Sequence, residues 1–462
     1  MLKAAAVAAF ILLTCLQSPA QAPAALARNV DAVLDRFLRS SGVPGLAVAI
    51  VQNGELVYAT AAGKASLSPK RAATAETRYA VGSISKQFTA AALLLLEEEG
   101  KVSLDDQVAK YFPGLTRANE VTIRELLSHT SGYEDYAPQD YIIPEWMKPI
   151  APDAILDRWA TKPLNFDPGT RWQYSNTNYV LAAKIFEKAS GQNLTSFLQR
   201  RIFDPLGMQS AGDCISDKSP KDAVAYTRYA LGPPRPVQRE GEGWYFGAGE
   251  LCMTPTDLAR WDVAFLRKKI LDSHSYQEFT REVMLKNGDS THYALGLQLG
   301  DFDGVPTISH SGEVSGFLAI NTVFPSADAA VVVLSNQDGV DVIGPVSRQI
   351  AAFLVNPGQK PASTGEVKQV EAILSGLQSG DIDRSLFTSD ANFYFGKLAL
   401  QDYRQSLSKL GKLISVTRTR ERLRGGMTQR VYDAKFQKKT VTLNTYVTSG
   451  GKYEQFLVEE QF

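Results

Sequence analysis

The alternation of hydrophobic and polar positions near the start of the chain predicts a β-hairpin followed by a helix. Residues 45–52 form an apolar run rich in β-branched side chains, and Asn53-Gly54 is a strong signal for a hairpin turn. Residues 55–60 then return as a second strand-like run. In residues 86–100 the apolar positions recur at helical spacing, and the last glycine can end the helix.

Beyond this helix the patterns predict a mostly helical middle and then a return to strands. Helical spacing continues to about residue 270, and four strand-like runs follow between residues 293 and 335. An apolar helical pattern at residues 342–355 closes the region. Strands, a long helical insertion, further strands and a final helix are typical of an α/β fold in which helices flank a sheet and an all-α lobe lies beside it.

A second domain is expected after residues 357–365, whose proline, glycine and serine content predicts a linker. Helical patterns at residues 366–378 and 400–410 precede four alternating strand-like runs between residues 414 and 458. We therefore expect residues 366–462 to form a small α+β C-terminal domain. This order of helices and strands resembles the SnoaL-like cone fold.

The first 22 residues have the pattern of a secretory signal peptide. Lys3 precedes an apolar run at residues 4–13, and small and polar residues then lead to Ala20-Gln21-Ala22, which fits an A-x-A cleavage site. The apolar run is shorter than the ~20 residues that a membrane span needs. We expect residues 1–22 to be removed, the chain to be periplasmic or secreted, and no segment to span a membrane.

Composition and charge exclude several kinds of partner. The 462 residues include 49 Lys+Arg and 49 Asp+Glu, so the chain has no net charge with which to attract nucleic acid. Three cysteines are too few for a disulfide-built scaffold. After removal of the signal peptide only Cys214 and Cys252 remain, and the sequence leaves open whether they pair or are two separate buried thiols.

The segment Ser83-Ile84-Ser85-Lys86 is a candidate nucleophile motif, because it lies at the start of the helix predicted for residues 86–100. One helical turn separates Ser83 from Lys86, so their side chains project from the same face. The positive end of the helix dipole favours both an alkoxide and a deprotonated lysine, which can activate a serine without a histidine. The S-x-x-K pattern alone is weak evidence, since residues 406–409 and 449–452 repeat it.

Two rarer motifs follow in order along the chain. Tyr174-Ser175-Asn176 is the only Y-x-N among 18 tyrosines, and His310-Ser311-Gly312 is the only H-x-G among four histidines. With these three motifs in this order, the chain resembles the serine beta-lactamase and penicillin-binding superfamily, particularly class C beta-lactamases and the related D-alanyl-D-alanine carboxypeptidases, D-aminopeptidases and esterases. Further matches are Leu126-Leu127-Ser128-His129-Thr130-Ser131-Gly132, Pro168-Gly169, Pro205-Leu206-Gly207-Met208 and Gly247-Ala248-Gly249.

This resemblance implies a beta-lactamase/transpeptidase-like fold across residues 28–356, with an antiparallel sheet flanked by helices and an all-α lobe. It also implies that Ser83 attacks a carbonyl carbon while Lys86 and the Tyr174 phenol accept and return its proton. We expect the nearby lysine to stabilise a phenolate and to lower the pKa of Tyr174. The sequence leaves open which of the two is the base.

The same resemblance implies the substrate-binding groups. Asn176 would orient the acyl side of the substrate, and His310, Ser311 and Gly312 would line the site. The backbone N–H groups of Ser83 and Glu313 would form an oxyanion hole. We expect no metal and no cofactor, and we expect His129 to be structural.

The motif His310-Ser311-Gly312 is also a departure from class C beta-lactamases, which have Lys-Thr-Gly there. A histidine is mostly neutral at pH 7, so it attracts a penicillin carboxylate less strongly than a lysine does. We therefore do not expect efficient beta-lactam hydrolysis.

The sequence thus predicts an exported serine hydrolase that forms an acyl-serine with an ester or a D-amino-acid-containing amide, as an esterase or D-peptidase. Its partners would be small ester, peptide or beta-lactam substrates. The alternatives are a beta-lactamase and a non-catalytic penicillin-binding or sensor protein that uses the same cleft. No G-x-S-x-G, H-E-x-x-H, G-x-x-x-x-G-K-[ST] or G-x-G-x-x-G motif supports a different enzyme class. The oligomeric state and the role of the C-terminal domain are left open.

Overall fold

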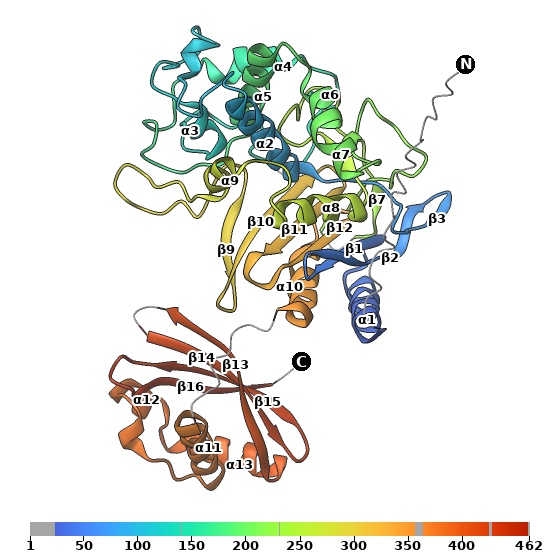
Figure 1. Cartoon of the computed structure of the whole chain (residues 1–462). Helices are drawn as coiled ribbons and strands as arrows, with labels where there is room; N and C mark the ends of the chain where they lie inside the picture. Colours follow the sequence, from blue (N-terminus) through green and yellow to red (C-terminus); the bar gives the residue numbers. More distant parts are fainter. Residues whose placement is uncertain (1–23, 140, 231, 356–363, 425–426, 461–462) are drawn as a thin grey trace, which may run out of the picture. The chain divides into compact units, whose positions relative to one another are not determined.

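The computed structural model describes residues 24–460 apart from residues 140, 231, 356–363 and 425–426 (Figure 1). The predicted signal peptide at residues 1–22 and most of the predicted linker at residues 357–365 lie outside the described residues. The chain divides into two compact units, the first formed by residues up to 299 with residues 308–351, and the second by residues 300–307 with residues from 352 onward.

A seven-stranded sheet forms the framework of the first unit, in the order β3-β2-β1-β12-β11-β10-β9. The N-terminal strands pair with the C-terminal strands in its middle, where Leu46 of β1 lies opposite Ser335 of β12 in antiparallel register. Both central strands are almost entirely buried, which explains their continuous apolar sequences. The strands are β1 Gly45–Gln52, β2 Glu55–Leu67, β3 Lys70–Ala72, β9 Gln298–Phe302, β10 Val305–Val314, β11 Phe317–Phe324 and β12 Ala329–Ser335.

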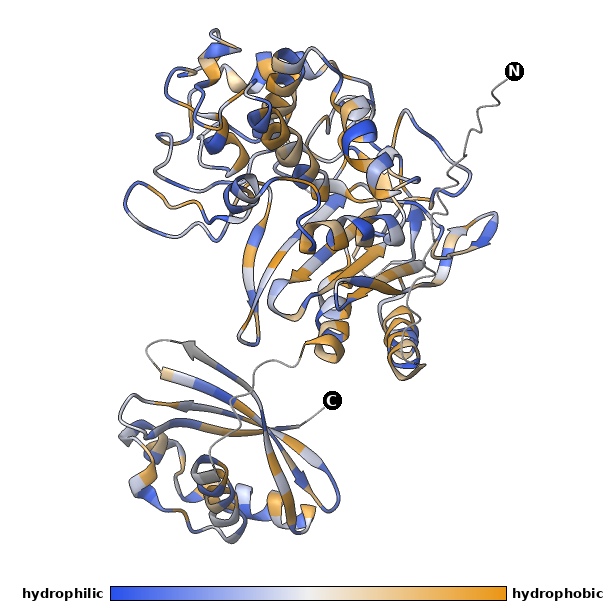
Figure 2. Cartoon of the chain, in the orientation of Figure 1, coloured by the Kyte–Doolittle hydropathy of each residue, from blue (hydrophilic) through white to orange (hydrophobic). Residues whose placement is uncertain are grey.

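Helices pack on this sheet and form a lobe beside it, as the fold prediction required. Helix α8 contacts β1, β2, β11 and β12, while α1 contacts β1 and β2. In the lobe, α2 packs against α5, α6 and α9 and is buried on all sides from Ser85 to Leu96. The helices are α1 Ala24–Ser41, α2 Ser85–Glu98, α3 Ile123–Leu127, α4 Pro152–Ile155, α5 Asn176–Ser190, α6 Leu194–Leu198, α7 Asp204–Leu206, α8 Pro255–Leu266, α9 Ser273–Thr280 and α10 Ile343–Leu354. Figure 2 shows the hydrophobic colour concentrated along α2 and the middle of the sheet.

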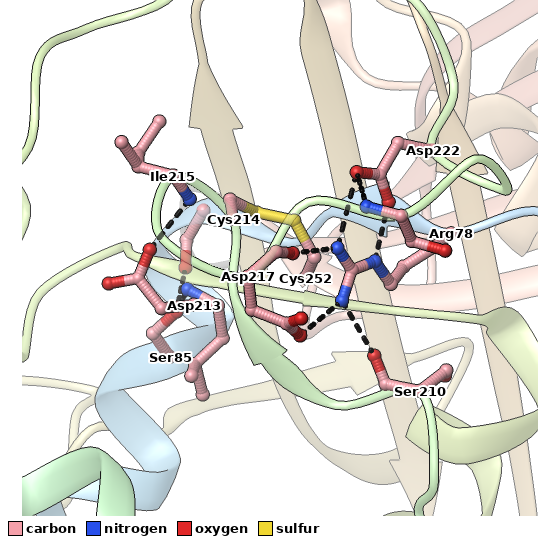
Figure 3. Close-up of a disulfide and its surroundings, with 12 residues drawn as sticks. Arg78, Ser85, Ser210, Asp213, Cys214, Ile215, Asp217, Asp222 and Cys252 are labelled. Carbon is pink, nitrogen blue, oxygen red and sulfur yellow. Dashed lines mark hydrogen bonds and ion pairs between the residues drawn. A yellow bond between two sulfur atoms is a disulfide. The ribbon is translucent and has the colours of Figure 1, made fainter.

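A disulfide joins two short strands that lie next to the S-x-x-K segment. Strand β8 (Leu251–Met253) pairs with both β4 (Tyr79–Ala80) and β5 (Gly212–Asp213). Cys252 of β8 is bonded to Cys214, directly after β5 (Figure 3). The pairing that the sequence left open is therefore present. A second small sheet pairs β6 (Tyr226–Thr227) with β7 (Arg235–Pro236).

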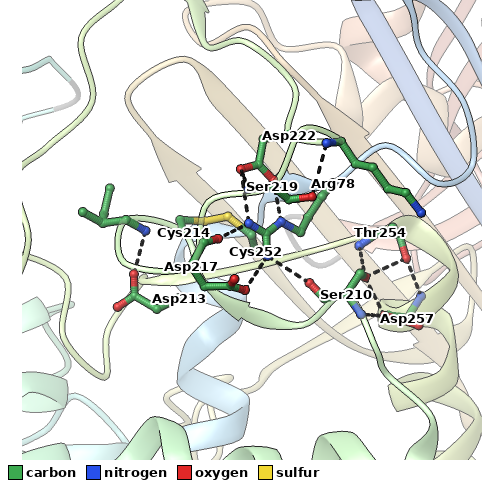
Figure 4. Close-up of polar contacts among 12 residues, drawn as sticks. Arg78, Ser210, Asp213, Cys214, Asp217, Ser219, Asp222, Cys252, Thr254 and Asp257 are labelled. Atoms are coloured by element: carbon green, nitrogen blue, oxygen red, sulfur yellow. Dashed lines mark hydrogen bonds and ion pairs between the residues drawn. A yellow bond between two sulfur atoms is a disulfide. The ribbon is translucent and has the colours of Figure 1, made fainter.

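An ion-pair cluster holds the same region together. Arg78 immediately precedes β4 and is buried, and its guanidinium forms ion pairs with Asp217 at 2.7 Å and Asp222 at 2.5 Å. Nearby, the Asp257 carboxylate accepts hydrogen bonds from the backbone N–H and the hydroxyl of Ser210 (Figure 4). The segment that contains the disulfide is thus tied at several points to the strand that leads into Ser83.

The second unit is the small α+β domain that the sequence predicted. Its sheet has the antiparallel order β13-β14-β15-β16. Val370 and Leu374 of α11 share a buried cluster with Tyr432 and Leu443 of the sheet. The elements are α11 Thr364–Ser379, α12 Ser389–Tyr394, α13 Lys397–Leu407, β13 Leu413–Arg424, β14 Met427–Phe436, β15 Thr440–Val447 and β16 Tyr453–Glu460. The SnoaL-like likeness stays a prediction.

Some element boundaries differ from the sequence expectation. The strand expected from residue 293 begins only at Gln298, because the chain turns at Gly296 (φ 74°), whose N–H donates to the Leu127 carbonyl. Strand β2 continues to Leu67 instead of ending at residue 60, and α1 has no counterpart in the prediction. Among the described residues, no helix has the length and apolar character of a membrane span.

Candidate active site

The end of β4 and the start of α2 position Ser83 and Lys86. A 3-10 turn, Gly82–Ile84, joins the two elements, and Lys86 is the second residue of α2. Ser83 is partly exposed, whereas Lys86 is completely buried. The Lys86 Nζ lies 3.0 Å from the Ser83 Oγ. The side chains of this S-x-x-K motif therefore meet, as the helical spacing predicts.

The N-terminus of α5 brings the second motif to the same point. Tyr174 precedes this helix, and its hydroxyl donates a hydrogen bond to the Ser83 Oγ at 2.7 Å. Asn176 is the first helical residue, and its Oδ1 accepts from the Lys86 Nζ at 2.8 Å. Helices α2 and α5 pack directly against each other, so their N-termini hold these four side chains in one cluster.

The contacts of the Lys86 amine determine where its lone pair points. The Nζ donates to the Asn176 Oδ1 and, at 2.7 Å, to the carbonyl oxygen of Ala248. Neither oxygen carries a hydrogen, so both must be acceptors. A neutral amine has two N–H groups for these partners, and its remaining tetrahedral position faces the Ser83 Oγ. In that form Lys86 can accept the serine proton.

Burial lowers the pKa of Lys86 and raises the pKa of Tyr174, and the sequence did not predict the second of these shifts. Removal from water lowers the pKa of Lys86 to about 7, although the Asp135 carboxylate opposes this shift. Burial raises the pKa of Tyr174 above its ordinary value, although the hydrogen bond with Ser83 opposes that shift. The expected lysine-stabilised phenolate is therefore not supported, because desolvation of the phenol outweighs the hydrogen bond with Ser83 and the Asp135 carboxylate raises the Tyr174 pKa further.

Strand β10 (Val305–Val314) carries the third motif to a place next to the Ser83 turn. The His310 Nδ1 lies 2.5 Å from the Ser311 carbonyl oxygen and must donate to it, so the Nε2 accepts from the Tyr293 hydroxyl at 2.8 Å. Burial lowers the pKa of His310 to about 3, which keeps the ring neutral. Both ring nitrogens are thus occupied by protein partners.

Glycine is required at positions 82 and 312, where β10 approaches the Ser83 turn. A side-chain carbon at Gly312 would overlap the Val81 carbonyl and lie 3.1 Å from the Ser83 nitrogen. Gly82 has a φ of 51°, and a side-chain carbon there would lie 2.8 Å from the Glu313 nitrogen. The backbone nitrogens of Ser83 and Glu313 are therefore neighbours, as an oxyanion hole between them requires.

A cavity of about 460 Å³ opens above these groups and contains residues that the sequence analysis missed. Besides Ser83, Tyr174, Asn176, His310, Ser311 and Glu313, it is lined by Asp135, Trp146, Gln173, Glu240, Tyr245 and Gln298, among others. Asp135 accepts hydrogen bonds from the backbone N–H of Asn176 at 2.9 Å and from its side-chain amide at 3.2 Å. The only sequence signal for Asp135 is its position three residues after the LLSHTSG motif.

His129 lies next to the Tyr174 ring, and within the described part of the chain it forms no hydrogen bond with Ser83. Its Nδ1 accepts from the Ser175 backbone N–H at 3.2 Å, and its ring lies 4.3 Å from the Tyr174 ring, centre to centre. These contacts fit the structural role expected for His129. Within the described residues, no cluster of His, Cys, Asp and Glu has the arrangement of a metal site.

Comparisons with known proteins show which family and which relatives this chain is similar to. Residues 30–353 match the family model described as Beta-lactamase. Penicillin-binding protein 4* of Bacillus subtilis is 31% identical over 309 residues, which cover 63% of this chain and 68% of that protein. A D-aminopeptidase of Brucella anthropi is 30% identical over 284 residues, covering 59% of this chain but only about half (52%) of that protein. A solved D-stereospecific amidohydrolase from Streptomyces sp. has a TM-score of 0.61 and 25% identity, covering 71% of this chain and 98% of that one.

The contact at Gly312 generates a prediction. Gly312→Ala should lower the free energy of unfolding by about 1–3 kcal/mol, because the added methyl group overlaps the Val81 carbonyl and forces β10 away from the Ser83 turn. Denaturant unfolding followed by tryptophan fluorescence measures this, since all five tryptophans precede residue 299. Gly114→Ala is the matched control, because no atom lies within 4 Å of a methyl group there. Equal midpoints for the two variants would contradict the close approach.

Proposed function

The chain belongs to the Beta-lactamase family, and from that premise we propose that it is a serine hydrolase that cleaves D-amino-acid amides or peptides through an acyl-serine. The observation that carries the proposal is the position of the Ser83 Oγ, within hydrogen-bond distance of both the Lys86 Nζ and the Tyr174 hydroxyl. A serine held between a neutral amine and a phenol is arranged for nucleophilic attack.

In the proposed acylation, Ser83 attacks the substrate carbonyl while the Lys86 amine takes its proton. Tyr174 remains a phenol, because burial raises its pKa, and by donating to the Ser83 oxygen it stabilises the negative charge that develops there as the proton leaves. The backbone N–H groups of Ser83 and Glu313 receive the negative charge of the carbonyl oxygen. The Lys86 proton passes by way of Tyr174 to the leaving nitrogen, and the C–N bond breaks.

In the proposed deacylation, water attacks the acyl-serine carbonyl and the same groups act in reverse. Lys86 accepts the proton of the water, Tyr174 gives its own proton to the Ser83 oxygen as it leaves, and the Lys86 proton then passes to Tyr174, so that both groups are neutral again. Asn176 donates through its amide to Asp135 and accepts from Lys86. These contacts hold the Lys86 amine in the same position during acylation and deacylation. An ester would react through the same steps, with a better leaving group than an amide has.

The choice of D-amino-acid amides or peptides rests on the relatives. One is named a D-aminopeptidase, and it covers 59% of this chain, while another is named a D-stereospecific amidohydrolase and covers 71%. The neutral, fully hydrogen-bonded His310 supports the choice against a beta-lactamase, because it offers no positive charge to a penicillin carboxylate.

We also propose that the chain is exported. The disulfide between Cys214 and Cys252 supports this, because such bonds persist in oxidising compartments and are rare in the cytosol of most organisms. The signal-peptide pattern of residues 1–22 supports it independently.

Reaction with a fluorophosphonate tests the proposed nucleophile. The intact mass of the wild-type protein should show one adduct, and folded Ser83→Ala should show none. Ser406→Ala is the matched control, because Ser406 begins another S-x-x-K segment but lies on α13 and donates only within its own helix. Ser85 is less suitable as a neutral control, since its hydroxyl links the Gly82 carbonyl to the Leu251 N–H. No adduct on folded wild-type protein would favour the non-catalytic, ligand-binding alternative.

The pH dependence of that reaction tests the base. Below pH 7 the rate should rise about tenfold per pH unit as Lys86 loses its proton, and it should level off above pH 7, because burial lowers the pKa of Lys86 to about 7. His129 and His310 are held neutral by burial and add no step near pH 7. The second-order rate constant of modification between pH 5 and pH 10 measures this.

Tyr174→Phe is the companion variant for the pH profile. It should react about 100-fold more slowly with the midpoint still near pH 7, since the phenol acts as a donor and not as the ionising group. A wild-type rate that shows no inflection near pH 7 and still climbs above pH 9 would instead assign the base to Tyr174.

The start of the mature chain and the state of its cysteines test the proposed export. Produced with its leader in a bacterium that exports proteins, the recovered chain should begin after Ala22 and show no free thiol until it is reduced. Intact mass and thiol titration before and after reduction measure both properties. A chain that keeps residues 1–22 and stays in the cytoplasm would contradict the proposal.

A further inference from the structure

The cavity above Ser83 is lined by acidic side chains from three separate segments. Asp135 follows α3, Glu240 precedes β8 and Glu313 lies on β10. No lysine or arginine is among the described residues that line this cavity. Burial and the carboxylates of Glu240, Asp135 and Glu313 raise the pKa of the Tyr245 phenol beside them. The cavity is therefore a negative environment.

Glu240 has hydrogen-bonding capacity that the protein does not use. Only 5% of its surface is exposed, and its Oε1 accepts a hydrogen bond from the backbone N–H of Ser315 at 3.0 Å. Its Oε2 is buried and has no hydrogen-bond partner among the described residues. A buried carboxylate oxygen without a donor is unfavourable, and a ligand that supplies a donor relieves that cost.

The groups around Glu240 do not neutralise it by contact. Arg239, its neighbour in sequence, is close enough to interact electrostatically with Glu240, but its guanidinium lies over the Phe317 ring at 5.4 Å and forms no ion pair with Glu240 among the described contacts. Asp135 differs from Glu240, because it already accepts hydrogen bonds from Asn176 and Ala137. Glu240 is thus the carboxylate of the cavity best suited to a ligand cation.

Aromatic rings complete the chemistry expected for a bound ammonium group. Tyr245 and Trp146 line the same cavity, with ring centres 6.4 Å apart. The faces of such rings attract cations, and the attraction increases when water is excluded. By contrast, the neutral His310 offers no charge to a ligand carboxylate.

We propose that Glu240 forms an anionic subsite that binds a substrate ammonium group, so that the enzyme selects acyl groups carrying a free amine. The proposal rests on the proposed function, because the ammonium is bound while the adjacent carbonyl carbon is presented to Ser83. Substrates whose amine is acylated lose this contact, and substrates with a carboxylate in the same place are repelled.

Protection of Ser83 from a fluorophosphonate at pH 7 tests the subsite. The competing compounds are D-phenylalaninamide, its N-acetyl derivative and its N-succinyl derivative, which present a cation, a neutral group and an anion. The free amine is mostly protonated at this pH. It should protect at a concentration roughly tenfold to hundredfold lower than the N-acetyl compound, as expected for a hydrogen bond to a charged group. The N-succinyl compound should protect least.

Glu240→Gln is the informative variant, because glutamine has the same shape and can still accept from the Ser315 N–H. The ratio of protective concentrations for the acetylated and free amines should fall to near one. Glu242→Gln is the matched control, since Glu242 loses the same charge but is exposed and lines a different cavity. It should keep the wild-type ratio.

The outcomes separate failure of the subsite from failure of the enzyme assignment. If wild-type Ser83 reacts but the ratio is already near one, or if Glu240→Gln leaves the ratio unchanged, the subsite is wrong and the hydrolase proposal stands. If wild-type Ser83 does not react, titration calorimetry of D-phenylalaninamide into wild-type protein and Glu240→Gln decides the question. Equal affinities there would overturn the subsite, and weaker binding to the variant would support it without turnover.

Discussion

The burial of one lysine amine is the constraint on which the rest of the site depends. Lys86 is fully buried, and its Nζ is held by Asn176, Ala248 and Ser83 at 2.7–3.0 Å. A charged ammonium in that place would lack solvation, so the environment favours the neutral amine that a serine nucleophile needs. Each partner comes from a different part of the fold. The α2 turn supplies Ser83, α5 supplies Asn176, and the segment before β8 supplies the Ala248 carbonyl.

This constraint explains features that look unrelated in the sequence. Helix α2 is buried on all sides by its packing against α5, α6 and α9, and this burial keeps water away from the amine near its N-terminus. Strand β8 follows Ala248 closely and is bonded through Cys252 to Cys214, so the carbonyl that binds Lys86 lies in a segment that leads directly into an anchored strand. The ion pairs of the buried Arg78 side chain with Asp217 and Asp222 secure β4, the strand that leads into Ser83. The framework around the site is therefore rigid where the chemistry requires fixed distances.

Sequence patterns predicted the framework and the motif side chains, but not their environment. Ser83, Lys86, Tyr174 and Asn176 could be selected because helix spacing and short motifs are local properties of the chain. The predicted lowering of the Tyr174 pKa was wrong, because desolvation of the phenol depends on groups that only the fold brings together. Asp135, Glu240 and Tyr245 lie singly in irregular segments, where no periodicity marks them. The bond between Cys214 and Cys252 depends on a distance, which spacing along the chain does not specify.

The pairing of β1 with β12 has a consequence for how the protein is made. Roughly 280 residues separate the end of β1 from the start of β12, yet the two strands are neighbours in the middle of the sheet. At about 5–20 residues per second, a ribosome needs on the order of 10–60 s to deliver the partner of that apolar edge. An open, hydrophobic strand edge invites pairing with other chains during that interval. The nascent chain therefore exposes an unpaired apolar strand edge until its last central strand has emerged.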